Sequence, residues 1–442
     1  MKTIIFIGTN KSGSSYEAFK LSDNMRYYTV LLTNRKTFIK KRLEFPHVHF
    51  MEFCDINNIY EIRKAITSFI EKGLDIHAIV SFIDPYCYTA SILSQEFGLK
   101  YFSAEAISIM LDKIKSREIL DGSPYVPFFY KMNDNKTLPN EMIKESLILK
   151  SPTSTGSKDV YRVQTYRQYE KVFHEIKKRY PDEPVLVEEY LEGPQYLVET
   201  VTINHEVHIV AIIEQEITFT GRFIVTGYKM ILAHDNEFYR SLKEAVNFII
   251  NKFGIKDGPC HLEIRYVKNK WKLIEANPRI SGGAINLFIE TAYGINLVKE
   301  TLKFALGFIP DFKYKYKKES FLQYVIVLRE GVLIKVTGKN KALNCPGVEQ
   351  VYIRPKKGSA IMPPISMGYR YAYVIATGES ADKAIENAKY GTSNIKFHIR
   401  EMNDDTLNKR GKSEREILNT AYKNQQDNNK INFFSNNFIL YN

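Results

Sequence analysis

Short apolar runs alternate with amphipathic segments in the N-terminal part of the chain. Residues 3–7, 28–33 and 78–82 are apolar runs of strand length, as expected for strands that are buried on both faces. Residues 59–71 carry apolar side chains at helical spacing, and the predicted stripe is formed by Ile59, Ile62, Ile66 and Ile70. This alternation of strands and helices predicts a parallel, doubly wound sheet.

The middle of the chain is rich in strand signals, which predicts an antiparallel arrangement. The predicted strands are residues 147–150, 185–187, 196–203, 206–214, 222–232, 261–267 and 271–275, of which the last two form a hairpin. Residues 238–253 predict an amphipathic helix, and the polar residues 131–145 predict a surface excursion. Farther along, residues 321–397 combine short strands with one helix at 381–388, and the chain from residue 404 onward predicts a polar helix or tail.

Composition excludes several classes of protein. Hydrophobic residues make up 44% and charged residues 25% of the 442 residues, which excludes a disordered, collagenous or coiled-coil chain. No run approaches the roughly 20 apolar residues of a membrane-spanning helix, and the apolar N-terminus is too short for a signal peptide. The four cysteines lie far apart without a Cys-x-x-Cys pair, which disfavours a zinc site or a disulfide scaffold and predicts a cytoplasmic protein.

The net charge of +12 fits a partner that is nucleic acid, an anionic membrane surface or a nucleotide. The basic clusters are short and contain no interleaved aromatic residues. They are therefore interpreted as solvated faces, and no nucleic-acid or membrane partner is predicted.

Two carboxylates and an amide provide the strongest chemical signal. Alternation along the predicted hairpin places Glu263 and Glu275 opposite each other, and Asn277 follows on the same side as Glu275. Two carboxylates and an amide oxygen suit coordination of Mg²⁺, and like charges this close repel one another without a cation. A solvated strand face with charges at alternate positions fits the spacing equally well.

A loop of small polar residues, 151–158, follows the predicted strand that ends at Lys150. Its backbone N–H groups suit phosphate oxygens and the lysine adds a point charge, with an ordinary flexible hairpin loop as the alternative. Residues 187–193 run from a strand into an acidic, aromatic bend, which fits either adenine recognition or an exposed turn. The glycine-containing residues 8–15 match neither the GxGxxG nor the Walker pattern, and they are a weak signal for ligand contact.

Arg279 closely follows the predicted metal ligands and precedes a short segment of small residues, 281–283. An arginine beside a metal site suits transferring phosphoryl oxygens or a substrate carboxylate. The glycines of the segment free the backbone to approach a ligand, and they equally fit a turn before a helix at 284–293. Asp84 follows an early strand and fits either a site for a substrate ammonium group or a cap of the next helix.

In their order along the chain, these residues resemble the ATP-grasp superfamily of carboxylate–amine ligases. The chain is most similar to the L-amino-acid ligases, or dipeptide synthases, of the biotin-carboxylase-like group. Residues 111–117 resemble the segment of the first nucleotide lysine, residues 153–158 the loop that closes on the triphosphate, and residues 188–191 the adenine hinge.

The resemblance implies a set of site residues. ATP is expected to be held by Lys113, Lys150, Ser154, Gly156, Ser157, Glu188, Glu189, Tyr190, Leu191 and Gln195. The expected metal ligands are Glu263, Glu275 and Asn277, and the expected catalytic residues are Arg279, Ser281 and Gly282. Candidate substrate contacts are Asp84, Tyr228 and Gly283.

The resemblance covers residues 1–398 and implies an α/β and α+β architecture. Its parts are an N-terminal parallel-sheet domain before the ATP-grasp fold (1–108), the small lobe (109–187) and large lobe (188–312) of a two-lobed ATP-grasp domain, a C-terminal mixed α/β module (313–398) and a polar tail (399–442). Residues 346–348, 368–370 and 374–378 of the module are similar to those of L-amino-acid ligases that make dipeptides.

The implied activity is the ATP-dependent joining of a carboxylate to an amine through an acyl phosphate, with release of ADP and phosphate. The expected cofactors are ATP and two Mg²⁺ ions, with Mn²⁺ as an alternative ion. Amino acids or other small carboxylates and amines are the expected partners, and a homodimer is left open. A biotin- or purine-type carboxylase and a catalytically silent nucleotide-binding regulator are the alternatives. Two departures, Gln195 for an acidic residue near the ribose and Tyr228 for a histidine, indicate a different substrate pocket.

Overall fold

The computed structural model describes residues 1–84, 86–133, 138, 146–154, 159–220, 222–232 and 236–401. Most of the predicted excursion at 131–145, the loop residues Gly156 and Ser157, and residues 402–442 of the predicted polar tail lie outside the described residues. The chain divides into two compact units. The first unit comprises Met1–Thr153, Arg162–Glu214 and Met230–Ser320, and the second comprises Ser154–Tyr161, Gln215–Lys229 and Phe321–Asn442.

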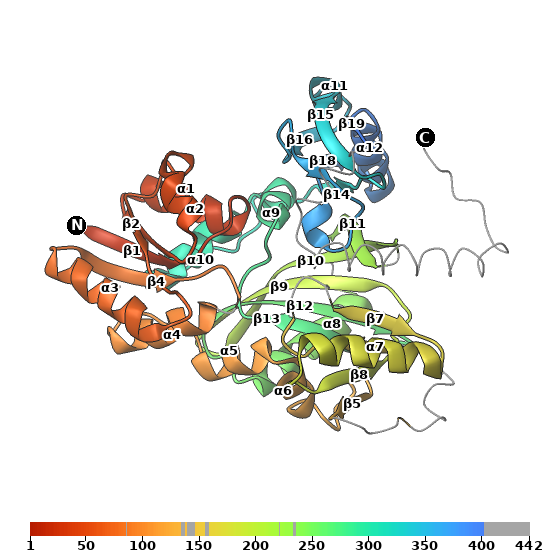
Figure 1. Ribbon diagram of the computed structural model, residues 1–442, viewed down its shortest axis with the longest axis horizontal. Coiled ribbons are helices and arrows are strands. Elements are labelled where there is room, and N and C mark those ends of the chain that lie inside the picture. The colour runs from red at the N-terminus through yellow and green to blue at the C-terminus, as the bar shows by residue number, and fades with distance from the viewer. Residues whose placement is uncertain are drawn as a thin grey trace. The chain divides into compact units, whose positions relative to one another are not determined.

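A four-stranded parallel sheet begins the first unit, in the order β3-β2-β1-β4. Its elements are β1 (Lys2–Ile7), α1 (Ser14–Asn24), β2 (Tyr28–Thr33), α2 (Lys36–Lys40), a short 3₁₀ helix (Arg42–Glu44), β3 (Phe50–Phe53), α3 (Ile59–Glu71), β4 (Asp75–Val80) and α4 (Tyr86–Glu96). Helices α1 and α2 lie on one face and α3 and α4 on the other (Figure 1), which confirms the predicted doubly wound arrangement. Because β1 lies between β2 and β4, the strand order reverses there, and the loops after β1 and β4 meet at one edge of the sheet.

Helix α3 illustrates how local sequence sets an element and where the pattern misleads. Asn58 caps its start by accepting a hydrogen bond from the backbone N–H of Tyr60. The predicted stripe is wrong at its end, because Ile70 is 42% exposed while Phe69 is buried. The buried face is centred on Ile62 and Phe69, so Ile70 lies at its rim.

A small antiparallel sheet follows in the first unit, except that Val160 and Tyr161 belong to the second unit. The elements are α5 (Ala104–Leu111), α6 (Lys113–Glu118), β5 (Phe129–Met132), β6 (Leu147–Lys150), β7 (Val160–Val163), α7 (Tyr166–Arg179) and β8 (Val185–Glu189). Strand β8 pairs antiparallel with both β5 and β6. Lys150 pairs in register with Leu186, two residues before Glu188, so the side chains of Lys150 and Glu188 lie on one face of the sheet.

The largest sheet of the first unit carries most of the candidate site. Its strands are β9 (Gln195–Ile203), β10 (Glu206–Phe219), β12 (Gly258–Val267) and β13 (Lys270–Asn277), in the order β13-β12-β9-β10, and the end of β10 belongs to the second unit. Helix α8 (Glu237–Lys252) buries Leu242, Val246 and Ile249 in an apolar cluster that includes Trp271. Helices α9 (Ile285–Tyr293) and α10 (Leu297–Ala305) follow β13. The predicted strands and hairpin are therefore present.

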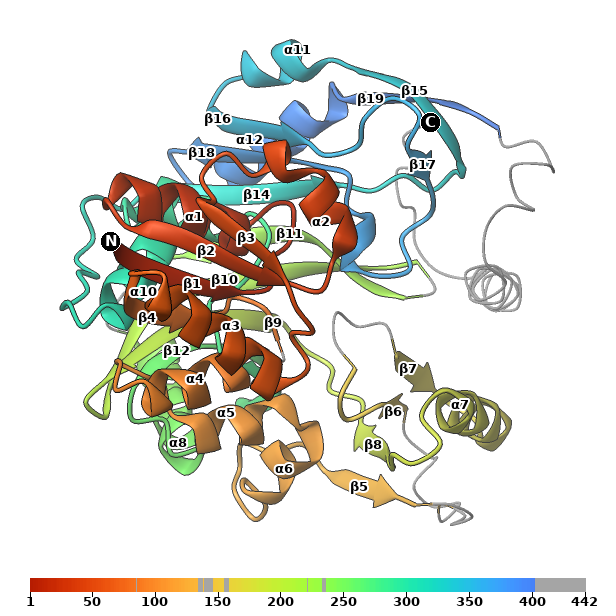
Figure 2. The same cartoon turned by 60° about the vertical axis from the view of Figure 1, so that its left-hand side comes forward.

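The second unit contains two sheets (Figure 2). One has the order β11 (Phe223–Ile231), β14 (Glu319–Val325), β18 (Ala372–Gly378) and β16 (Val348–Ile353), and the other has the order β17 (Ala360–Ile361), β15 (Gly331–Thr337) and β19 (Lys396–Arg400). The last two residues of β11 and the first two of β14 belong to the first unit. The remaining elements are α11 (Lys339–Leu343), a 3₁₀ helix (Met367–Tyr369) and α12 (Ala381–Ser393). Helix α12 runs beyond the predicted residues 381–388, as far as Ser393. Near its end Gly391 packs closely on β18, because a Cβ there would lie 3.0 Å from Val374. No helix among the described residues is long and apolar enough to cross a bilayer.

Candidate active site

The hairpin of β12 and β13 brings the predicted metal ligands together. Glu263 pairs in register with Glu275, which confirms that the two glutamates face each other, and His261 pairs with Asn277. The register shifts after Glu263, where Ile274 forms a bulge in β13. No three His, Cys, Asp or Glu side chains cluster for a metal ion within the described part of the chain, so the set depends on the amide of Asn277. Two carboxylates and an amide are hard oxygen ligands, and this donor set fits Mg²⁺.

Gln195 orients the carboxylate of Glu263. Its amide nitrogen donates to Glu263 Oε2 at 3.0 Å, and its amide oxygen accepts from Arg265 Nε at 2.9 Å. Arg265 also donates to the backbone oxygen of Leu191. The glutamine that was expected near the ribose therefore connects the metal-ligand face to the predicted adenine hinge.

A buried chain of alternating charges links α6, β6 and β8. Glu188 accepts from Arg117 Nε with one carboxylate oxygen and from Lys150 Nζ with the other, each at 2.6 Å. Arg117 is fully buried and also donates to the backbone oxygen of Ile274 at 2.5 Å, so the bulge in β13 supplies an acceptor. The carboxylate of Glu188, expected at the adenine, is held between two cations in this structure.

Lys113 and Glu275 form a second pair, with 3.2 Å between Nζ and Oε1. Burial raises the pKa of Glu275, but the cations of Lys113 and Lys150 outweigh it and hold that pKa below its usual value. Burial lowers the pKa of Lys150 to about 8, with Glu188 opposing this effect and the charge of Arg117 adding to it. The two predicted nucleotide lysines therefore lie in one charged cluster beside the metal ligands, where positive groups suit phosphate oxygens.

Backbone contacts fix the path of the predicted adenine hinge. The N–H of Glu189 donates to the backbone oxygen of Phe128 at 3.1 Å, and the Glu189 carboxylate accepts from the Phe128 N–H at 2.8 Å. The N–H of Tyr190 donates to the backbone oxygen of Ser146 at 2.9 Å. Leu191 is buried. The hinge residues are thus tied to the small sheet, and their contact with adenine stays a prediction.

The loop after β6 is anchored at its start. The hydroxyls of Ser151 and Thr153 donate to the two carboxylate oxygens of Glu183 at 3.1 and 2.7 Å. Ser154, the last described residue before the gap at 155–158, belongs to the second unit. Its phosphate contact stays a prediction, as do those of the two loop residues outside the described part.

Arg279 is held by Asp84, which lies just after β4. Its Nε and a terminal nitrogen both donate to Asp84 Oδ2, at 2.9 and 2.5 Å, although 195 positions separate the two residues. The side chains of Arg279 and Asp84 are 20% and 8% exposed. No donor among the described residues reaches Asp84 Oδ1, so the hydrogen bond that the helix-cap alternative requires is not seen there.

The segment at 281–283 lies against the loop after β1. The hydroxyl of Ser14 donates to the backbone oxygen of Ser281 at 2.8 Å. Gly13 has a φ of 78° and a Cβ there would lie 3.0 Å from Gly283 N, so this position requires glycine. The N–H of Ser281 donates to the fully buried Glu199 at 3.1 Å. The Ser281 N–H is therefore engaged within the protein, and the catalytic roles expected of Ser281 and Gly282 stay predictions.

Glu199 is expected to give stability a measurable pH dependence. Burial raises its pKa to about 7 from an ordinary 4.5, so between these pH values the folded chain binds a proton that the unfolded chain has released. Stability therefore falls as pH rises through this window, by about 3 kcal/mol. Glu199→Gln still accepts from the Ser281 N–H but does not ionise, so its stability should lack this fall.

Urea unfolding of both proteins at about pH 5 and about pH 8 measures the difference. The single tryptophan, Trp271, is buried in the first unit and reports its unfolding by fluorescence. Burial lowers the pKa of His261 to about 4 from 6.5, which raises stability with pH across that window in both proteins and cancels in the comparison. An identical pH dependence for wild type and variant would contradict the assignment to Glu199.

The sequence patterns do not single out Arg117, Glu199 and His261, although usable signals existed. Arg117 lies four residues after Lys113 on α6, and this spacing places both side chains on one helix face. Glu199 is the one charged residue in the buried strand β9, and it pairs in register with His261 on β12. A charged residue within a buried strand indicates either an ion-pair or hydrogen-bond partner inside the protein or a role in function.

Tyr228, a predicted substrate contact, belongs to the second unit. Its hydroxyl accepts from Arg370 at 3.3 Å. The guanidinium of Arg370 also lies over the ring of Tyr324, 3.8 Å from its centroid. These contacts hold Tyr228 within the second unit, and its role toward a substrate stays a prediction.

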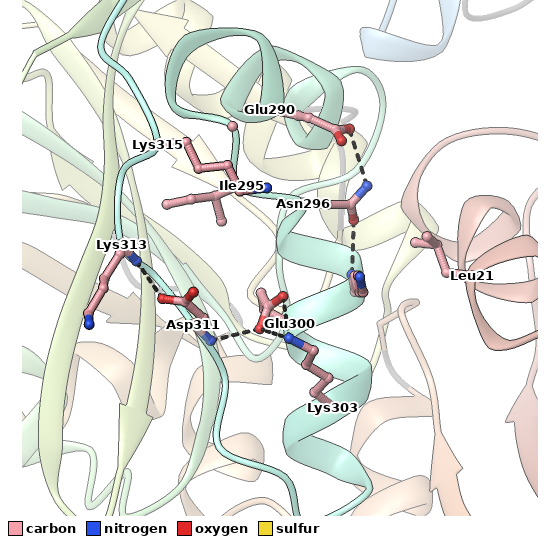
Figure 3. Close-up of a pocket in the computed structure, with 11 residues that line it drawn as sticks. Leu21, Glu290, Ile295, Asn296, Glu300, Lys303, Asp311, Lys313 and Lys315 are labelled. Atoms are coloured by element: carbon pink, nitrogen blue, oxygen red, sulfur yellow. Dashed lines mark hydrogen bonds and ion pairs between the residues drawn. The ribbon is translucent and has the colours of Figure 1, made fainter. Parts of the chain in front are cut away.

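A separate cavity of about 340 Å³ lies beside α10 (Figure 3). None of the described site residues predicted from the sequence lines it. Glu300 there accepts from Lys303 Nζ at 2.9 Å and from the backbone N–H of Asp311 at 2.7 Å. Because Glu300, Lys303 and the N–H of Asp311 bind one another, they add no group to the candidate active site.

Two family models match the chain. Residues 143–286, which include Lys150, Glu188, Glu263, Glu275 and Asn277, match the ATP-grasp domain. Residues 323–400 match the L-amino acid ligase C-terminal domain 2. The chain is an ATP-grasp ligase.

This ligase is similar to an L-arginine-specific L-amino acid ligase of Bacillus subtilis, with 21% identity over 327 residues that cover 71% of this chain and 78% of the relative. The crystal structure of an L-amino acid ligase from Bacillus licheniformis matches with a TM-score of 0.76 at 18% identity, over 91% of this chain and 99% of that chain. The biotin carboxylase domain of the Hydrogenobacter thermophilus 2-oxoglutarate carboxylase, in complex with MgADP, ADP and bicarbonate, matches with a TM-score of 0.65 at 16% identity, over 90% and 91% of the two chains. These likenesses confirm the predicted architecture of the ligase.

Proposed function

We propose that this ligase joins two amino acids, or an amino acid and a similar amine, into a dipeptide or related amide. The observation that carries the proposal is the match of residues 323–400 to the C-terminal domain of L-amino acid ligases, in a chain that also contains an ATP-grasp domain. The Bacillus relatives named above support it. The reaction passes through an acyl phosphate and releases ADP and phosphate.

The charged groups of the site suit phosphoryl transfer. Lys113, Lys150 and Arg279 neutralise phosphate oxygens while the carboxylate of the first substrate attacks the γ-phosphorus of ATP. Mg²⁺ bound by the predicted metal ligands would draw negative charge from the same oxygens. Two Mg²⁺ ions are proposed, as is usual where a triphosphate is bridged.

The second half of the reaction needs no protein nucleophile. The amine attacks the carbonyl of the acyl phosphate, and phosphate leaves. The N–H groups of Gly282 and Gly283 stabilise the tetrahedral oxyanion, and closure of the loop at 153–158 keeps water from the acyl phosphate.

A carboxylase that uses bicarbonate is the second candidate. The TM-score of 0.65 to a biotin carboxylase domain favours it. The C-terminal match to L-amino acid ligases argues against it.

A screen of ADP release with every amino acid, singly and in pairs, tests the proposal. We expect release that requires a pair of amino acids and that stops when EDTA removes divalent cations. Release with bicarbonate and no amino acid would identify a carboxylase instead. ATP binding without turnover under all conditions would identify a silent regulator.

A further inference from the structure

The ion pair of Asp84 and Arg279 is incomplete. Two guanidinium nitrogens donate to the one oxygen Oδ2, whereas the fork of an arginine can engage both oxygens of a carboxylate. Asp84 Oδ1 is buried, and no donor among the described residues reaches it. A buried acceptor without a donor is costly, so this pair retains a place for one additional cationic or N–H group.

The pair also lies where a ligand is expected. Asp84 follows β4, and Ser14, which follows the neighbouring strand β1, donates to Ser281. In doubly wound sheets, ligands bind at this edge, where the strand order reverses. Arg279 follows Asn277 by two residues, so a group bound to Arg279 lies near the predicted metal ligands.

We propose that Asp84 and Arg279 exchange their mutual ion pair for the two charges of an α-amino acid and thereby select a zwitterion as the acyl substrate. The proposal rests on the ligase activity proposed above. The substrate carboxylate replaces Asp84 at Arg279, and the substrate ammonium group replaces Arg279 at Asp84. Every buried charge then keeps an opposite partner.

A carboxylic acid without an amino group lacks the second half of this exchange. It would pair with Arg279 and leave the carboxylate of Asp84 buried without a cation, which is strongly unfavourable. The same two side chains that accept an amino acid therefore discriminate against a simple carboxylate.

Comparison of an active amino acid with the same acid lacking its amino group tests this exchange. Glycinamide serves as the amine in both assays, because it has no free carboxylate that ATP can activate. In the wild type we expect kcat/KM for ADP release to be at least about 100-fold higher with the amino acid. In Asp84→Asn we expect this ratio to fall below about 10-fold, mainly through KM, since an amide does not neutralise an ammonium group.

Two further variants make the test decisive. Asp75→Asn, at the other end of β4, replaces an exposed aspartate that pairs with His77, and it should keep the wild-type ratio. Asp84→Glu retains the carboxylate and should keep the preference, so it decides the matter if Asp84→Asn does not fold. A wild-type ratio near one, or an unchanged ratio in a folded Asp84→Asn, would overturn the exchange. Absence of ADP release from the wild type with every carboxylate and amine would instead overturn the ligase proposal.

Discussion

Replacing Glu275 by alanine is expected to reduce kcat/KM for ADP release by about 10³-fold or more. Glu275 faces Glu263 across the hairpin and pairs with Lys113, so its carboxylate is placed to serve both the proposed metal site and a proposed phosphate-binding lysine. Its removal leaves two of the three proposed oxygen ligands for Mg²⁺ and takes the carboxylate of Glu275 away from the buried Lys113. The measurement is ADP release at a series of Mg²⁺ concentrations, with circular dichroism to establish that the fold is retained.

Two companion variants identify the cause of the loss. Glu275→Gln keeps the size of the side chain and removes its charge, and we expect it to lose most of the activity as well. Glu71→Ala removes an exposed carboxylate at the end of α3 in the same unit, far along the chain from the predicted site residues, and should leave the rate unchanged. Near-normal ADP release by Glu275→Ala would refute the metal assignment.

The elements that local sequence determines were predictable. The helix at Ile59–Glu71 and the strands at Tyr28–Thr33 and Leu147–Lys150 have the bounds that their patterns indicate. The opposed glutamates were predictable for the same reason, because a short hairpin sets the register of Glu263 and Glu275 within a few residues.

The ion pairs that link distant segments were not predictable. Arg117 and Glu188 are 71 positions apart, and Arg279 and Asp84 are 195 apart. Alternation of polar and apolar residues shows which face of a strand is buried, but it does not show which other strand or helix covers that face. The partner of each of these charges therefore depends on tertiary packing.

The same limit applies to two candidate site residues. Asp84 fits an ammonium site or a helix cap from its sequence position, and in the structure its carboxylate accepts from Arg279; Ser281 is an expected catalytic residue, and its N–H donates to Glu199. A buried polar group without a partner is costly, so each finds one within the protein. The chemistry of a side chain indicates which kind of group it binds. Only the tertiary structure determines whether that group is a ligand or a neighbouring side chain.

Arg117 is expected to be the most important charged residue for the stability of the first unit. Arg117→Met keeps the length of the side chain and removes the guanidinium, which leaves Glu188 buried with Lys150 as its remaining cation in this cluster and Ile274 without its donor. Breaking a buried ion pair in this way costs about 3–5 kcal/mol. Urea unfolding followed by Trp271 fluorescence measures the loss.

The matched control is Lys115→Met on the same helix, whose side chain is exposed and whose replacement should change the free energy of unfolding by less than about 0.5 kcal/mol. Because the charge of Arg117 helps to lower the pKa of Lys150, that pKa should also rise in Arg117→Met, which slows modification of Lys150 by an amine-reactive reagent near pH 8. A variant as stable as the wild type, with Lys150 equally reactive, would show that the chain of charges from α6 to β8 does not hold the site together.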